Sequence, residues 1–311
     1  MTRIFKDIPA KRERVPMLVG LVGPSGSGKT YSALRLATGM QRATGGEIFY
    51  IDTESRRALH YADDFKFRHI AMEAPFSPLD YLAAIEHCVK QNAGVLIVDS
   101  MSHEHEGPGG VLEMHDTELD RMAGDDYRKR QKMTFTAWKE PKQQRRRLIN
   151  SILQLGVNAI FCFRAKEKLR IIPGKNPVNR GWQAIAGEEF VYEMTANVLL
   201  YPGAEGVPNW NPDEKDERAI TKRPAKLASK FSDGQPLSED SGEALSRWAE
   251  GDTDNQVSDQ DFAQSLIELT DVATRDQLTT LRESWVDRNW SPEQKVELNN
   301  VLRVKLNSLS E

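Results

Sequence analysis

An eight-residue turn, GPSGSGKT, stands between a short apolar run and an amphipathic segment, and it constrains the fold more than any other feature. The run before it, residues 16–22, has the length and composition of a strand buried on both faces. After the turn, apolar residues recur at helical spacing from Ala33 to Met40. The turn fits the pattern G-x-x-x-x-G-K-[ST] at every fixed position. The sequence therefore predicts a phosphate-binding loop made of Gly23, Pro24, Ser25, Gly26, Ser27, Gly28, Lys29 and Thr30.

The residue types in this turn suit a nucleoside triphosphate. Glycine lets the backbone curl until its N–H groups converge on phosphate oxygens, at the positive end of the following helix. We expect Lys29 to add charge beside the β- and γ-phosphates and Thr30 to offer its hydroxyl to Mg²⁺. Tyr31, the next residue, is counted among the nucleotide-binding residues. The predicted cofactors are ATP and Mg²⁺.

Strands alternate with helices along the N-terminal part of the chain. Apolar runs predict strands at 47–52, 94–100 and 157–163, and helices are predicted near 78–91 and at 139–155. Such alternation is typical of a parallel sheet with right-handed crossovers. The predicted fold class is α/β, with a mainly parallel central sheet flanked by helices.

Two carboxylates follow predicted strands and should emerge at the same edge of the sheet as the phosphate-binding loop. Asp99 closes the strand VLIVD, and we expect it to hold Mg²⁺ together with Thr30, with helix capping as the alternative. Many proteins with this loop carry a water-activating acid next to that aspartate, but here Ser100 occupies the place. Hydrolysis requires a carboxylate that orients the attacking water, so Glu54 and Lys29 are the predicted catalytic residues.

The segment YIDTE at 50–54, with Tyr61 seven residues beyond Glu54 and then the strand VLIVDS, resembles the ATPase core of RecA-like recombinases. The resemblance spans residues 16–202. It implies a RecA-like core, water activation by Glu54 and stacking of Tyr61 on adenine. The size of the chain and its stretch from Pro16 to Leu36 further resemble phage-encoded RecA-like ATPases associated with single-strand annealing and recombination.

One position departs from that family. Where the recombinases carry a glutamine that senses the γ-phosphate at the end of the fifth strand, this chain has Arg164, so the family's glutamine switch is not expected here. Arg164, Lys166 and Lys168 form an alternating basic row. Three alternatives stay open for this row: a phosphate contact across a subunit interface, a DNA contact, or solvation.

The resemblance also implies that two loops, at 101–130 and 165–187, face DNA in a filament. The second loop combines cations for phosphates with an aromatic side chain for base stacking, which is how single strands are bound. A buried structural tryptophan is the alternative for its aromatic residue. Beyond Lys166 and Lys168, the candidate DNA-binding residues of this loop are Arg170, Lys175, Arg180 and Trp182.

The net charge of −4 hides an uneven distribution. Residues 128–180 hold fifteen Lys or Arg against two acids, which favours a polyanion as partner over a solvated helix face. Arginines 145–147, within that block, are expected on an exposed helix face. His103 and His105 lack the spacing of a helical zinc site, so we expect a polar loop near the γ-phosphate there rather than a metal centre.

Composition shifts predict the domain organisation. Residues 1–250 are expected to form the ATPase domain, with a strand at 218–222, residues 251–259 a polar linker, and residues 260–311 a small helical domain.

Cysteine and hydropathy patterns predict the compartment. Cys88 and Cys162 lie in apolar segments and are expected as reduced core thiols, as in a cytoplasmic protein. If the chain is phage-encoded, that cytoplasm is the bacterial host's. No apolar run approaches the ~20 residues of a membrane-spanning helix, so no membrane partner is expected.

Together these features predict an ATPase that acts on single-stranded DNA in phage-type recombination or annealing, with turnover stimulated by DNA. The resemblance implies self-association into a ring or filament, and a single-strand-binding protein as a further partner. Two other functions fit the same motifs: a helicase or translocase motor, and a nucleotide-gated adaptor with little turnover.

Overall fold

A computed structural model gives the chain as two compact units, Met1–Glu250 and Gly251–Glu311. It describes residues 7, 10, 12–170, 176–211, 221–231, 234–251, 257, 259–285, 288, 290 and 292–309. Among these residues, none of the helices has the length and apolar character needed to cross a bilayer.

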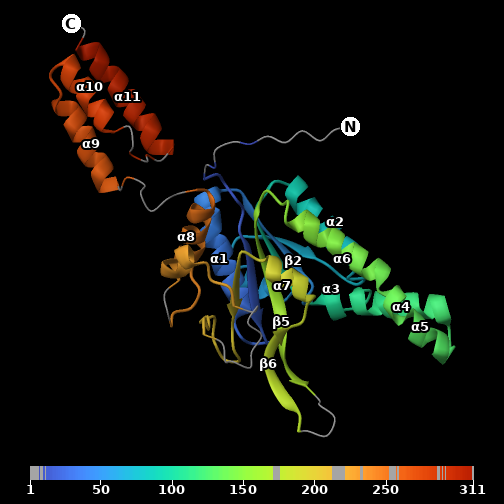
Figure 1. Cartoon of the computed structure of the whole chain (residues 1–311). Coiled ribbons are helices and arrows are strands. Elements are labelled where there is room, and N and C mark those ends of the chain that lie inside the picture. Colours follow the sequence, from blue (N-terminus) through green and yellow to red (C-terminus); the bar gives the residue numbers. More distant parts are fainter. Residues whose placement is uncertain are drawn as a thin grey trace, which may run out of the picture. The chain divides into compact units, whose positions relative to one another are not determined.

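The first unit is built on a seven-stranded sheet with the order β3-β2-β4-β5-β1-β7 and with β6 paired to β5 (Figure 1). Neighbours along the main path are parallel, and β5 and β6 are antiparallel. The α/β fold with a mainly parallel sheet is therefore confirmed. The strands are β1 Leu18–Gly23, β2 Glu47–Asp52, β3 Arg68–Ala71, β4 Ala93–Asp99, β5 Asn158–Arg170, β6 Val178–Ala184 and β7 Ala196–Leu199.

Helices cover both faces of this sheet, which is why its central strands read as continuous apolar runs. On one face, Val19 and Leu21 of β1 pack in a core with α1 (Lys29–Thr44) and α8 (Glu239–Ala249). On the other face, Leu18 and Val22 pack in a second core with α2 (Pro78–Lys90) and α6 (Lys139–Ile152). Figure 1 shows these two helix layers on either side of the strands.

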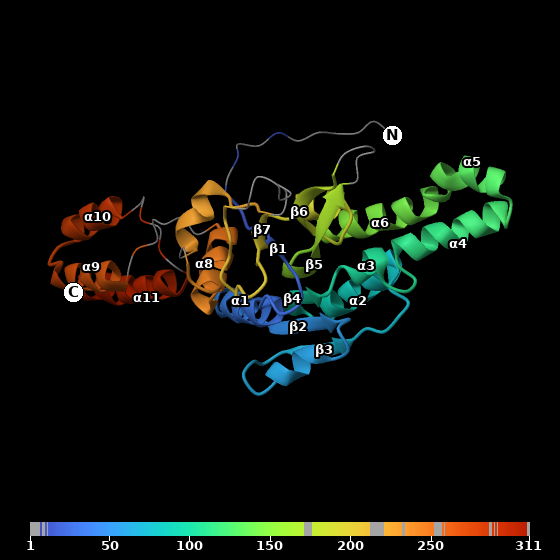
Figure 2. The same ribbon diagram turned by 90° about the horizontal axis from the view of Figure 1, so that it is seen from below.

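Helices replace the loop predicted at 101–130. They are α3 (His103–Glu106), α4 (Val111–Ala123) and α5 (Tyr127–Ala137). Asp126 caps α5 by accepting a hydrogen bond from the backbone N–H of Lys129 at 3.0 Å. Figure 2 shows α4 and α5 side by side as an arm that extends beyond the sheet. The loop prediction was wrong here because α4 buries only one narrow face, at Val111, His115, Leu119 and Ala123.

The second predicted loop, 165–187, is largely a β-hairpin. The strand predicted at 157–163 continues to Arg170, and Ala165 pairs with Ala184 of β6. The alternating basic residues that ended the apolar pattern are the outer part of the same strand, since a strand that leaves the sheet needs no continuous apolar run. Of the strand predicted at 218–222, residues 218–220 lie outside the described residues, and Lys222 forms an isolated antiparallel bridge with Asn197.

Shorter elements complete the first unit: η1 Arg57–Tyr61, α7 Glu188–Glu193 and η3 Ala225–Lys230. The second unit has three helices among its described residues, and Thr274 and Gln277 form a capping box at the second. Its own buried cluster includes Phe262, Trp285 and Trp290. The helices are α9 Asp259–Asp271, α10 Arg275–Ser284 and α11 Pro292–Ser308.

Candidate functional site

The phosphate-binding loop joins the carboxyl end of β1 to the first turn of α1. Gly26 and Gly28 adopt φ angles of 77° and 92°, a left-handed conformation that residues with a β-carbon rarely tolerate. A β-carbon at Gly28 would also stand 2.6 Å from the backbone nitrogen of Gly206. The backbone conformation therefore explains why glycine occupies positions 26 and 28, and the turn has the curvature predicted from its sequence.

Lys29 points back into this turn. Its ammonium group donates hydrogen bonds to the carbonyl oxygens of Gly23 at 2.8 Å and Pro24 at 2.7 Å. Burial lowers the pKa of Lys29, and the nearby carboxylates of Asp99 and Glu54 oppose that shift. The side chain thus brings a positive charge to the mouth of the turn, where a phosphate chain would lie.

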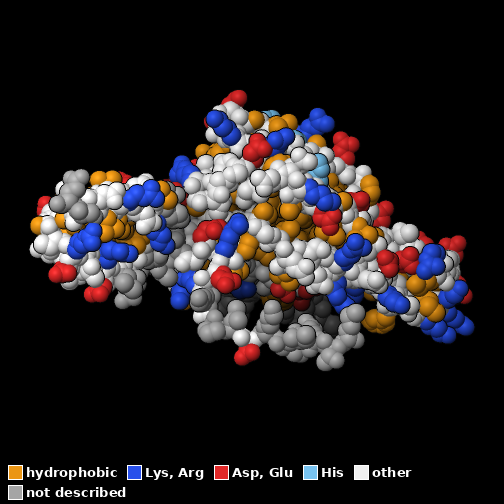
Figure 3. All heavy atoms as spheres, turned by 90° about the horizontal axis from the view of Figure 1, so that it is seen from above, with side chains coloured by type: hydrophobic (Ala, Val, Ile, Leu, Met, Phe, Trp, Pro, Cys, Tyr) orange, Lys and Arg blue, Asp and Glu red, His pale blue; other side chains and the backbone are white. Residues whose placement is uncertain are grey.

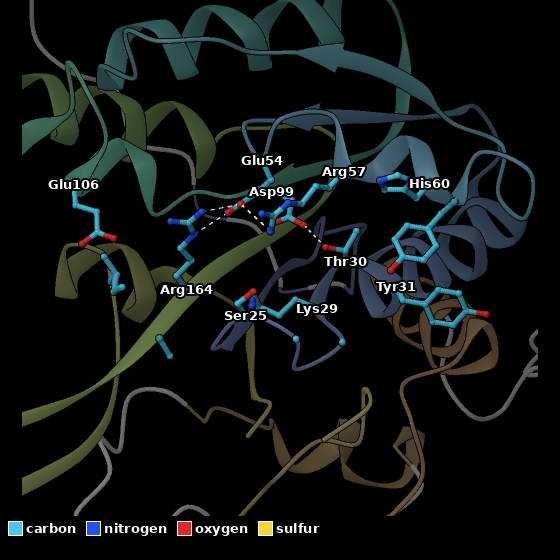
Figure 4. Close-up of a pocket in the computed structure, with 15 residues that line it drawn as sticks. Ser25, Lys29, Thr30, Tyr31, Glu54, Arg57, His60, Asp99, Glu106 and Arg164 are labelled. Atoms are coloured by element: carbon cyan, nitrogen blue, oxygen red, sulfur yellow. Dashed lines mark hydrogen bonds and ion pairs between the residues drawn. The ribbon is translucent and has the colours of Figure 1, made fainter. Parts of the chain in front are cut away.

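Thr30 and Asp99 meet beside the loop, as Figure 4 shows. The Thr30 hydroxyl donates to Oδ2 of Asp99 at 2.7 Å, and the Tyr50 hydroxyl donates to the same oxygen at 2.8 Å. Burial raises the pKa of Asp99, while these two hydrogen bonds act in the opposite direction. A hydroxyl and a carboxylate are oxygen ligands of the kind that Mg²⁺ prefers, so this pair fits the predicted metal.

Glu54 lies in the same cavity, but Arg164 holds its carboxylate. The guanidinium Nε donates to Oε1 at 2.8 Å and Nη2 donates to Oε2 at 2.7 Å, a bidentate ion pair. The Glu54 side chain is 16% exposed and that of Arg164 is 38% exposed. Burial alone would raise the pKa of Glu54, but the hydrogen bonds and charge of Arg164 lower it below its ordinary value. Glu54 is therefore ionised at neutral pH.

Asp52 fixes the turn that carries Glu54. Its buried carboxylate accepts from the backbone N–H groups of Glu54 at 2.7 Å and Ala58 at 3.2 Å, and contacts the His69 ring at 3.1 Å. The sequence motif contained Asp52, but its role is visible only once β2 and β3 stand side by side. It is a positioning residue for Glu54.

One cavity of about 630 Å³ is lined by both predicted catalytic residues and by the predicted nucleotide-binding residues other than Gly23, Pro24 and Ser27. Tyr31 and Tyr61 line one end of it, with ring centroids 5.6 Å apart. Arg57 and His60, which the sequence did not single out, also line it. They lie one turn apart on η1, three and six residues after Glu54, and this closeness to Glu54 in the sequence was the signal that could have identified them. Its lining includes Ser25, Gly26, Gly28, Lys29, Thr30, Glu54, Asp99 and Arg164.

The other candidate residues of the hairpin are dispersed. Lys166 forms an ion pair with Glu106 at 3.6 Å, so the first two members of the basic row are paired within the chain. Lys168 is exposed, and Trp182 is half-buried against the second core. Arg170 and Arg180 lie on β5 and β6 without described side chains, and Lys175 lies outside the described residues.

The histidine-rich segment is the short helix α3 and not the predicted loop. Nδ1 of His103 lies 2.8 Å from the Thr53 hydroxyl, and buried Glu104 makes a bidentate ion pair with Arg145 at 3.0 and 2.9 Å. The expectation that Arg145 is exposed was wrong: it is buried by this pairing with a residue from a distant segment. Within the described ranges, no group of three or more His, Cys, Asp or Glu residues could hold a metal.

The two thiols are buried and unpaired, as predicted. Burial raises the pKa of Cys88 to about 11 and raises that of Cys162. Neither thiol is therefore a nucleophile at neutral pH.

The comparison with protein families agrees with the predicted phosphate-binding loop. Residues 16–198 match the family described as AAA domain. Among solved structures, a KaiC-like protein from the hyperthermophilic archaeon Pyrococcus horikoshii is similar at 18% identity and a TM-score of 0.33, covering 62% of this chain and 82% of that one. That similarity is too distant to carry an argument about activity. The curated proteins contain no match.

Proposed function

This chain belongs to the AAA domain family, and from that membership and the cavity geometry we propose that it binds and hydrolyses Mg-ATP and acts on single-stranded DNA. The P-loop ATPase domain accounts for nucleotide binding. The observation that carries the rest is the meeting of four side chains in one cavity at the carboxyl edge of the sheet: Lys29, Thr30, Glu54 and Asp99.

Each of these four side chains has a distinct part in the proposed reaction. Lys29 neutralises charge on the β- and γ-phosphates, and Thr30 and Asp99 hold Mg²⁺, which when bound would offset the charge that develops on the phosphate oxygens. Glu54 accepts a hydrogen bond from the attacking water and orients it towards the γ-phosphate. Tyr31 and Tyr61 supply aromatic surface for the adenine.

The proposal that the polymer is single-stranded DNA rests on the charge distribution and on the resemblance to RecA-like recombinases. Fifteen basic residues against two acids in 128–180 attract a polyanion, and the RecA-like pattern around Glu54 suggests recombination or annealing of strands. Self-association into a ring or filament, a single-strand-binding protein as a further partner, and a phage origin belong to the same proposal.

An ATPase assay with and without single-stranded DNA tests this function. We expect Mg²⁺-dependent release of phosphate that EDTA abolishes and that an oligodeoxynucleotide stimulates, with Lys29→Ala as the inactive control. Electron microscopy of the same samples checks for rings or filaments. Turnover that DNA leaves unchanged would remove DNA from the proposal and leave an ATPase of another kind.

One observation favours a second candidate, the nucleotide-gated adaptor. Because Arg164 engages both carboxylate oxygens of Glu54, the water-orienting group is held by another side chain. Such a site binds ATP but turns it over slowly until Arg164 moves. Tight ATP binding with a single turnover over hours, with DNA present, would favour this candidate over the ATPase.

A further inference from the structure

Helix α5 of the arm and helix α6 follow one another directly along the chain, and together they are called the rod here. Helix α5 ends and α6 begins at Trp138, which itself has helical backbone angles of −70° and −10°. The N–H of Lys142 donates to the carbonyl of Trp138 at 3.1 Å, which is the first helical hydrogen bond of α6, and Pro141 has no N–H to donate back into α5. The helical backbone angles of Trp138 keep the residues of α5 and α6 close to a common helical repeat, although these are two separate helices.

One side of this rod is buried and the opposite side is strongly basic. The buried positions in its second half follow the spacing of one helix face: Pro141, Arg145, Leu148, Ile149 and Ile152. From Tyr127 to Ile152 there are nine basic residues and a single acid, Glu140. Two of the nine pair with acids, Arg130 with Asp120 and Arg145 with Glu104. The others are exposed: Arg128, Lys129, Lys132, Lys139, Lys142, Arg146 and Arg147.

These seven exposed cations have no ion-pair partner among the residues that the structure describes. Lys132, Lys139 and Arg146 recur every seven residues, which places them on one line about 10 Å apart. Beside Arg146, a shallow hollow of about 290 Å³ is lined by neutral or basic side chains: Gln143, Arg146, Arg147, Asn150, Ser151 and Gln154. Glu140, next to Lys139, is the one acid between Tyr127 and Ile152, so basic side chains dominate the potential along this line.

Exposed aromatic rings accompany the cations. Phe135 is 88% exposed and Tyr127 is 71% exposed, although aromatic side chains are usually at least partly covered. Helical spacing puts Phe135 on the same side as Arg128 and Lys139. Figure 3 shows basic side chains at the outer end of the arm, with hydrophobic and some acidic ones among them.

This combination identifies the chemistry of the partner. Unpaired cations at regular intervals suit a chain of phosphates, and exposed rings between them suit unstacked bases. A nucleic-acid duplex could pair its phosphates with the cations, but its bases are already stacked and paired and could not stack on the exposed rings. We propose that the outer face of α5–α6, defined by Arg128, Lys132, Phe135, Lys139 and Arg146, binds single-stranded nucleic acid. This inference rests on the proposed function. It places the contact with nucleic acid on helices α5 and α6 and not on the β5–β6 hairpin.

The test compares two triple variants with the same change in charge. The arm variant carries Lys132→Glu, Lys139→Glu and Arg146→Glu. The control carries Arg282→Glu, Lys295→Glu and Arg303→Glu, three exposed basic residues of the second unit. Binding of a fluorescein-labelled oligodeoxythymidylate is followed by anisotropy over a range of salt concentrations. A third variant, Phe135→Ala, removes an exposed ring without changing charge, so it carries little risk of misfolding.

We expect the arm variant to bind at least 30-fold more weakly than the control, with the slope of log affinity against log salt reduced by about 2, as three lost phosphate contacts require. Phe135→Ala should weaken binding roughly fivefold to 100-fold at an unchanged slope. ATPase activity without DNA should stay at the wild-type level in all three, because none of these residues lines the nucleotide cavity.

Three results would overturn the inference. If wild-type protein binds the oligonucleotide and the arm variants bind as the control does, the surface is elsewhere and the proposed function stands. If wild-type protein binds no single strand at all, the inference fails together with the DNA part of the proposed function, while the ATPase part is judged by phosphate release. If the arm variants lose binding only to vesicles containing phosphatidylserine, the surface belongs to a membrane.

Discussion

Replacing Glu54 with glutamine distinguishes the role of the cavity in ATP hydrolysis from its role in ATP binding. The substitution keeps the shape of the side chain and one oxygen that can accept from Arg164, but it removes the negative charge that orients and polarises water. Lys29 and Thr30, which would hold the phosphates and the metal, stay in place. The expected outcome is therefore a protein that binds ATP with nearly wild-type Kd and hydrolyses it far more slowly.

Two magnitudes follow from the geometry. Loss of a positioned general base slows a reaction by about 10²- to 10⁴-fold, which raises the barrier by roughly 3–5 kcal/mol. The ion pair with Arg164 is 16% and 38% exposed at its two ends, so weakening it costs about 1 kcal/mol of folding stability. For a unit of this size that corresponds to a fall in Tm of about 2–4 °C. Turnover should thus change by orders of magnitude while stability changes little.

The assay measures kcat, Kd for ATP and Tm on three proteins: the wild type, Glu54→Gln and Glu47→Gln. Glu47 is a control because it stands at the other end of β2 and makes an exposed ion pair with a single contact, 2.8 Å from Arg68. Its replacement should leave kcat unchanged. A Glu54→Gln protein that binds ATP and keeps kcat within about threefold of wild type would refute the assignment of Glu54 as the base.

Three further outcomes are expected. Lys29→Ala should lose detectable binding of a fluorescent ATP analogue with a Tm close to wild type, and retained binding would show that the loop does not hold the phosphates. Burial lowers the pKa of His105 from 6.5 to about 4, so the folded protein binds fewer protons than the unfolded chain between those values. Stability present above pH 6.5 is then lost as the pH falls towards 4, by about 1–2 kcal/mol once solvent screening of this partly exposed ring is included, and His105→Gln should flatten that dependence in urea melts. A chain ending at Glu250 should fold and bind ATP with wild-type Kd, because each unit has its own buried core; aggregation of the shortened chain would contradict this.

The sequence predicted the central sheet well because burial on both faces leaves a pattern that few other structures produce. The strand expected at 94–100 spans 93–99, and the one expected at 47–52 has those bounds in the structure. Acids placed just after such strands must come out at one edge, so the meeting of Glu54 and Asp99 in one cavity followed from strand order alone.

Features that depend on distant partners were missed. Arg145 occupies a position on the apolar stripe of α6, between Pro141 and Leu148, and that placement was the available sign that it points inward. Its partner Glu104 lies 41 residues away on α3, and no local pattern reveals such a pair. The hairpin was missed for a related reason: β6 pairs only with β5, and an antiparallel partner outside the main sheet leaves no apolar run.

Arg164 belongs both to the nucleotide cavity and to the strand that forms the β5–β6 hairpin, two features that the sequence analysis considered separately. Its backbone belongs to β5 at the register position of Gly23, its N–H donates to the Ser102 hydroxyl at 2.8 Å, and its guanidinium closes on Glu54. A γ-phosphate in the cavity would be negatively charged, like that carboxylate, and would compete with it for the same cation. The hairpin continues directly from Arg164 through Ala165 to Lys166 and Lys168. In this structure the guanidinium that would have to reach a neighbouring subunit is engaged with Glu54 of its own chain.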